Sequence, residues 1–92
     1  MQGKKLSEFM DSLYINPEME VEYNNKKYLI SGYRDDDDSY VLRVDTIEET
    51  SQQIFLTKNN DVQKCVEGFE GAKLFDDKTI YQVEDKITVI YG

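Results

Sequence analysis

Polar and apolar residues alternate along residues 19–30, and this alternation is the clearest structural signal in the chain. Met19, Val21 and Tyr23 are separated by glutamates, which is the period of two expected of a half-buried β-strand. Asparagine occupies positions 24 and 25, and it tolerates the positive φ that a two-residue hairpin turn needs. We therefore expect a hairpin that pairs Tyr23 with Lys26, Val21 with Tyr28 and Met19 with Ile30.

The alternation resumes in residues 41–46, which predicts a third antiparallel strand. Its apolar side chains, Leu42 and Val44, have to join the face formed by the first hairpin. The connecting loop then spans about residues 33–39, and Gly32 is the natural position for a β-bulge. This arrangement predicts pairing of Ile30 with Leu42 and of Tyr28 with Val44.

Residues 52–57 predict a fourth strand, which returns beside the third after a loop at residues 47–51. Closure of Thr46 on Gln52 sets the register of this strand. The resulting pairs are Ile54 with Val44 and Leu56 with Leu42. One face of the sheet is then expected to hold Met19, Val21, Tyr28, Ile30, Leu42, Val44, Ile54 and Leu56.

Two segments have the apolar spacing of amphipathic helices. The first covers residues 6–15 and ends before Pro17, because proline disfavours helix at the residue before it. The second lies within residues 59–71, with Asn60 as its expected N-cap and Gly71 in the left-handed position after its end. Its apolar stripe consists of Val62, Cys65, Val66 and Phe69.

The C-terminal part predicts three shorter features. Leu74 and Phe75 return the chain to the core, Thr79 and Gln82 have the spacing of a capping box for one helical turn, and residues 86–91 form a last strand. The elements follow the order α-β-β-β-β-α-(α)-β. We expect one α+β domain over residues 1–92, with residues 1–5 flexible, in which an antiparallel meander of four or five strands carries helices on one face.

Composition narrows the classes of function. The net charge of −8 disfavours direct binding to nucleic acid or to anionic membranes. The chain has no histidine and one cysteine, which excludes an internal disulfide and the commonest metal ligand. No apolar run approaches the roughly 18 residues of a membrane span. We expect a cytoplasmic protein, and the richness in Lys, Asn, Ile, Tyr and Asp favours a bacterial or phage source.

Four consecutive aspartates, Asp35 to Asp38, are the most conspicuous candidate for chemistry. A helix–loop–helix calcium loop needs a glycine at its sharp turn and a glutamate at its end. In a loop that starts at Asp35 those places hold Tyr40 and Thr46, so this motif is excluded. A weak Ca²⁺ or Mg²⁺ site at the hairpin tip stays open, and so does a solvated loop that blocks association of strand edges.

A third hypothesis joins the aspartates to other acids as one recognition surface. Residues 34–50 contain seven carboxylates and two arginines, which gives this segment a strongly negative charge. Such a surface can attract a basic protein, or imitate the phosphates of DNA and occupy a nucleic-acid-binding cleft. The candidate acidic interaction face consists of Asp35, Asp36, Asp37, Asp38, Asp45, Glu48 and Glu49.

Nothing in the sequence predicts an enzyme or a cofactor. Cys65 lies on the apolar stripe of the second helix, where a buried structural thiol is expected. The glycines do not form a phosphate-binding loop, and no base stands at a recognisable spacing from a serine. We therefore expect a non-enzymatic protein-interaction or regulatory domain with an unknown protein partner, for which a basic protein is a candidate. A homodimer through the sheet edges or through outward apolar groups such as Leu29 and Phe55 is an alternative.

Overall fold

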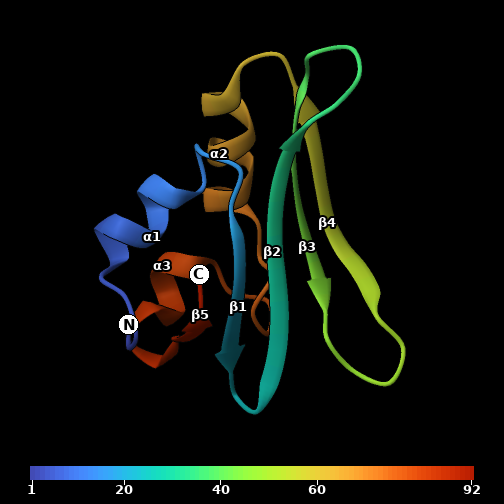
Figure 1. The fold of residues 1–92 in the computed structure, drawn as a ribbon. Coiled ribbons are helices and arrows are strands. Elements are labelled where there is room, and N and C mark those ends of the chain that lie inside the picture. Colours follow the sequence, from blue (N-terminus) through green and yellow to red (C-terminus); the bar gives the residue numbers. More distant parts are fainter.

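The structure, a computed structural model, describes residues 1–92 and contains a five-stranded antiparallel sheet with the helices on one of its faces (Figure 1). The strand order is β4-β3-β2-β1-β5. This confirms the predicted α+β class and the predicted order of elements. The elements are α1 (Leu6–Ser12), β1 (Glu18–Tyr23), β2 (Lys26–Arg34), β3 (Tyr40–Thr46), β4 (Gln52–Asn59), α2 (Val62–Gly71), α3 (Ile80–Val83), the 3-10 turn η1 (Glu84–Lys86) and β5 (Thr88–Tyr91).

The first hairpin forms in the predicted register. Asn24 and Asn25 both have positive φ, 52° and 64°, as a two-residue turn that follows the right-handed twist of its strands requires. The turn therefore fixes which side chains of β1 and β2 point to the helices. The observed pairs include Tyr23 with Lys26, Val21 with Tyr28 and Met19 with Ile30.

The predicted register of β2 against β3 is wrong by two residues. Ile30 pairs with Val44, not with Leu42, which pairs with Gly32. The loop spans residues 35–39 and is closed by a hydrogen bond from the Asp35 N–H to the Ser39 carbonyl. A shift of two residues keeps every side chain on its predicted face, because side chains alternate with a period of two.

Gly32 is not a bulge, because the register of β2 against β3 runs through it without a break. A Cβ atom at this position would lie 2.6 Å from both the Pro17 Cδ and the Tyr40 hydroxyl. The Gly32 N–H donates to the Pro17 carbonyl, so the chain before β1 lies directly against this strand. Glycine is needed here for the close approach of neighbouring groups.

The predicted register of β4 is correct at its start and wrong after Gln53. Thr46 pairs with Gln52 as expected, but a bulge then inserts Ile54, and Val44 pairs with Phe55. One extra residue reverses the face to which each later side chain of the strand points. Phe55 therefore faces the helices, and Leu56 faces away from them. Phe55 makes an edge-to-face contact with Phe69 of α2, and the expected core residues Ile54 and Leu56 are 38% and 51% exposed.

The helices form where predicted, with shorter ends. α1 stops at Ser12, three residues before the predicted end, and Leu13 follows it in a turn. The N-cap of α2 is Asp61 and not Asn60, because the Asp61 side chain accepts the Gln63 N–H. Gly71 is the last residue of α2 and has no positive φ, so its predicted left-handed role is wrong.

The C-terminal elements complete the sheet. The predicted capping box forms, since the Gln82 side chain accepts the Thr79 N–H at 2.8 Å. The last strand starts at Thr88, two residues later than predicted, because residues 84–86 form the 3-10 turn. β5 pairs with β1, and Gln2 forms a parallel bridge with Thr88.

The core lies between the sheet and the helices. Each helix contributes fully buried side chains, among them Phe9 of α1, Phe69 of α2 and Ile80 of α3. Tyr40 of β3 links the sheet to the segment after α1, because its buried hydroxyl donates a hydrogen bond of 2.7 Å to the Leu13 carbonyl. With all helices packed on one side, the opposite side of the sheet has no covering element (Figure 1).

Candidate functional site

The uncovered side of the sheet, here called the open face, carries apolar side chains in contact with solvent. It comprises the outward residues of β1 to β4, which follow from the observed registers. Tyr33 of β2 is 43% exposed, and Ile54 and Leu56 of β4 are similarly exposed. Exposed apolar side chains on one surface can mark a contact with another molecule when they form a continuous patch.

An ion pair occupies the middle of the open face. Arg43 and Asp45, neighbours on the same side of β3, form two bonds: Nε to Oδ2 at 2.8 Å and Nη2 to Oδ1 at 3.0 Å. Asp45 is only 7% exposed, and its carboxylate raises the pKa of the Arg43 guanidinium. The pair fixes both charged groups in one orientation amid apolar neighbours.

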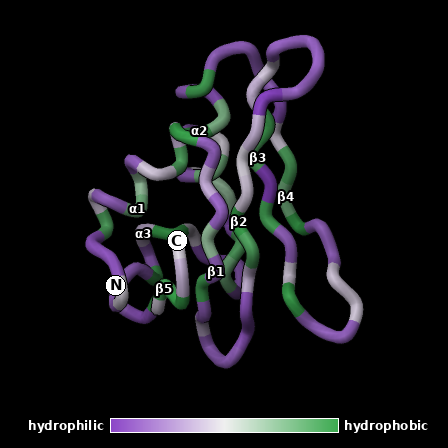
Figure 2. The backbone as a smooth tube through the Cα atoms, viewed as in Figure 1, coloured by the Kyte–Doolittle hydropathy of each residue, from purple (hydrophilic) through white to green (hydrophobic).

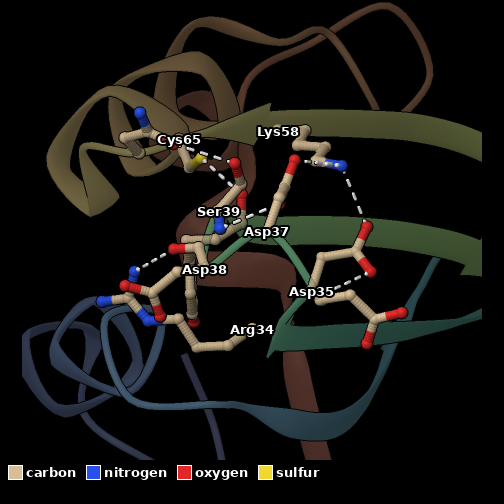
Figure 3. Close-up of polar contacts among 10 residues, drawn as sticks. Arg34, Asp35, Asp37, Asp38, Ser39, Lys58 and Cys65 are labelled. Atoms are coloured by element: carbon tan, nitrogen blue, oxygen red, sulfur yellow. Dashed lines mark hydrogen bonds and ion pairs between the residues drawn. The ribbon is translucent and has the colours of Figure 1, made fainter.

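The loop between β2 and β3, residues 35–39, is here called the first acidic loop. Lys58 of β4 bridges two of its carboxylates, at 3.0 Å from Asp35 and 3.1 Å from Asp37 (Figure 3). The hydrogen bond to Lys58 is the main cause that lowers the pKa of Asp35. The pKa of Asp37 is lowered first by the Ser39 N–H, which its side chain accepts, and then by Lys58.

The remaining aspartates of this loop have different surroundings. Asp38 has a positive φ of 66°, and its backbone carbonyl accepts a hydrogen bond from Arg34. Arg34 also lies over the Tyr40 ring, 5.6 Å from its centre. The Asp36 N–H donates to the Asp35 side chain, and the Asp36 carboxylate is exposed to solvent. The loop is therefore an ordered turn that presents two carboxylates without a cationic partner.

The second acidic loop, residues 47–51, lies at the opposite end of β3 (Figure 1). It carries Glu48 and Glu49. The seven residues of β3 separate the two loops by about 20 Å, at ~3.3 Å per residue. The candidate acidic face predicted from the sequence is thus divided: Asp35 to Asp38 at one end, Glu48 and Glu49 at the other, and Asp45 between them in its ion pair with Arg43.

The geometry of the carboxylates also bears on a cation site. Asp35 and Asp37 converge on the Lys58 ammonium group, which already occupies the space between them (Figure 3). No group of three or more acidic, histidine or cysteine side chains is arranged to hold a metal ion. The first acidic loop therefore binds a cation of the protein itself.

Cys65 and one surface pocket are the remaining places that hold groups capable of reaction. The Cys65 thiol is fully buried, as predicted, and lies 3.4 Å from the Tyr40 carbonyl. The pocket, of about 370 Å³, lies between the end of α1 and the start of β1. Ser12 supplies the hydroxyl group among the residues that line the pocket, and this hydroxyl donates a hydrogen bond to the Glu8 backbone carbonyl. The Ser12 hydroxyl is thus bonded to the backbone and not to the carboxylate of Asp11 or Glu18, which also line the pocket.

Sequence reasoning missed the apolar part of the open face, because Ile54 and Leu56 were assigned to the core. The bulge that exposes them is a single inserted residue, and the run from Ile54 to Leu56 is apolar throughout, so its pattern fits either face. The aromatic side chain of Phe55, which contacts Phe69 in the core, is the signal that would have favoured it as the inward residue. Figure 2 shows the result: an apolar middle of β4 and a hydrophilic first acidic loop.

Comparison with protein-family models, with curated proteins and with solved structures finds no significant match to this chain. No helix in the structure has the length and apolar character needed to cross a membrane. The exposed surfaces of the chain are therefore the features that bear on its function.

Proposed function

We propose that this chain is a small, acidic, non-enzymatic domain that binds another protein through the open face of its sheet. The observation that carries the proposal is the uncovered face itself, on which Tyr33, Ile54 and Leu56 are exposed around a fixed ion pair. Aromatic side chains and arginine are enriched among the residues that contribute most to binding at protein interfaces. We place this function in the cytoplasm, in keeping with a reduced, buried Cys65.

Charge favours a basic partner. Glu18, Glu20 and Glu22 point outward from β1, along one border of the open face. Two cations of the face are already engaged, Arg43 by Asp45 and Lys58 by the first acidic loop, and a third, Lys27, lies across from Glu22. A partner that brings lysine or arginine to this border would gain attraction at long range and faster association.

The test is affinity capture with matched bait variants, from the cells that produce the protein naturally. Tyr33→Ser removes an aromatic group of the open face, and Tyr14→Ser removes one of nearly equal exposure from the helical side, 43% against 41%. The proposal expects a partner that is retained by the wild type and by Tyr14→Ser but is lost or depleted with Tyr33→Ser. Loss with Tyr14→Ser alone would place the contact on the helices and refute it.

A further inference from the structure

β4 leaves one long edge of the sheet unpaired. It has eight residues, pairs only with β3, and forms the end of the strand order. The opposite edge is different, because β5 has four residues and Gln2 bridges to it at Thr88. An unpaired edge presents a row of N–H and C=O groups that can accept a strand from another chain.

The hydrogen-bonding pattern identifies which groups face this edge. Residues of an antiparallel strand direct their N–H and C=O groups alternately to one neighbour and to the other. The Gly32 N–H points toward β1, where it meets the Pro17 carbonyl, so its partner Leu42 directs its groups to Thr57 on β4. The N–H groups of Leu56 and Lys58, on either side of Thr57, therefore point to the open edge.

Charge is distributed unevenly along this edge. β4 itself carries one charged residue, Lys58, and no acid, within a chain of net charge −8. The second acidic loop precedes the strand, and the first acidic loop lies beside its end, where Lys58 neutralises only part of the charge. The edge is thus a neutral, β-prone strand with negative charge at both ends.

We propose that β4 accepts an extended segment of a partner protein as a sixth strand, and that this segment carries β-forming residues in its middle and lysine or arginine at both ends. The inference rests on the proposed function and specifies the partner of that domain. The backbone of the segment would pair with Leu56 and Lys58, and its basic ends would meet the two acidic loops.

A second copy of the chain fits this edge less well. A two-fold pair through β4 would be antiparallel, and the symmetry would repeat each contact on both sides. The first acidic loop of each copy would then lie beside the second acidic loop of the other. Carboxylates would face carboxylates at both ends, which opposes the dimer and favours a basic segment.

The first experiment uses two synthetic peptides, KKTVTVTKK and its acidic counterpart EETVTVTEE, titrated into the full chain and followed by amide NMR. The proposal expects binding of the lysine-ended peptide, slowed solvent exchange of the Leu56 and Lys58 amides, and weaker binding at high salt. Equal binding of the two peptides, or shifts confined to residues away from β4, would overturn it.

The second experiment isolates the outward backbone group. Leu56→Pro removes the outward N–H without breaking a bond to β3, whereas Leu56→Ala shortens the same side chain and keeps the donor. Binding of the lysine-ended peptide should be about tenfold weaker for Leu56→Pro than for Leu56→Ala. Equal affinity would contradict strand addition.

Charge variants keep the test valid if Leu56→Pro perturbs the fold. Neutralising Glu48 and Glu49 to glutamine, or Asp36 and Asp38 to asparagine, should each weaken binding and flatten its salt dependence. The matched control, Glu8→Gln with Asp85→Asn, removes the same charge from α1 and η1 and should change affinity much less. If the control loses as much affinity for the peptide, net charge alone explains the effect. The proposed contact of one basic end with each acidic loop is then refuted.

Two further outcomes separate this inference from the proposed function. A concentration-dependent dimer of the wild type that disappears in Leu56→Pro would make a second copy the occupant and overturn the inference. Failure of the lysine-ended peptide, together with a natural partner whose capture depends on Tyr33, would refute strand addition and leave binding at the open face standing.

Discussion

At the scale of single residues, Gly32 is a position inside the sheet that has no room for a side chain. Its absent side chain lets Pro17 and the Tyr40 hydroxyl approach, and a Cβ would lie 2.6 Å from each. Gly32→Ala should therefore destabilise the protein by about 1–3 kcal/mol, the usual range for an overpacked site. The measurement is chemical denaturation at neutral pH.

Gly71→Ala is the matched control for this substitution. A Cβ at Gly71 would meet nothing within 4 Å, and the residue lies at the end of α2 without a positive φ. Alanine at this place should leave stability unchanged or raise it by up to ~1 kcal/mol. A loss in both variants would contradict the close-approach role of Gly32.

Lys58 gives the first acidic loop a defined pH dependence. The pKa of Asp35 is lowered mainly by Lys58, and that of Asp37 first by the Ser39 N–H and then by Lys58. The stabilising contribution of these contacts is present above the ordinary carboxyl pKa and is lost as the pH falls through the lowered values. Lys58→Gln should reduce thermal stability at neutral pH, and this difference should shrink in acid, as the two carboxyls become protonated and lose their charge.

Lys64→Gln provides the control for the lysine substitution. Lys64 is exposed on α2 and forms no ion pair in the structure. Its replacement should have little effect at either pH, as expected of a solvated surface charge. A Lys58→Gln deficit that stays constant from neutral to acidic pH would show that the stabilisation does not come from the carboxylates.

At the scale of elements, the bulge in β4 decides which side chains reach the core. Phe55 faces α2 and contacts Phe69, while Leu56 lies on the open face. Phe55→Ala should cost roughly 2 kcal/mol or more, and Leu56→Ala should change stability by no more than about 0.5 kcal/mol. Denaturant titration of the two variants checks this, and the reverse order would restore the register predicted from the sequence.

The sequence predicts elements well where the determining interactions are local. The turn at Asn24 and Asn25 sets the first hairpin by itself, because its backbone preference and the alternation of β1 agree. The register of β3 depends on contacts between distant segments, namely Gly32 with Pro17 and Tyr40 with Leu13. Both candidate registers place the same side chains inward, so the pattern alone does not separate them.

In the candidate site, too, the sequence predicts local features but not contacts between segments that are distant along the chain. The turn propensity of Asp35 to Asp38 is visible in the sequence, but their ion pairs with Lys58 depend on the return of β4 to the loop. The acids at 48 and 49 are close to Asp45 in sequence, yet β3 places them far from the first acidic loop. Proximity in sequence therefore overstated the continuity of the acidic face.

At the scale of the whole molecule, the fold is one-sided. All helices cover one face of the sheet, which leaves the other face and the β4 edge to solvent (Figure 1). The net charge of −8 opposes association between copies of the chain, and the acids that border the open surfaces favour cationic groups. The shape and the charge together favour a basic protein that lies over the open face and beside β4.

The most direct test is amide hydrogen exchange of the full chain in complex with the partner recovered by affinity capture. Our account predicts that the Leu56 and Lys58 amides, which point to the open edge, exchange rapidly in the free protein and slowly in the complex. The amides of α1 and α3, on the far side of the core, should exchange alike in both states. Protection of α1 and α3 with unchanged exchange along β4 would contradict the account.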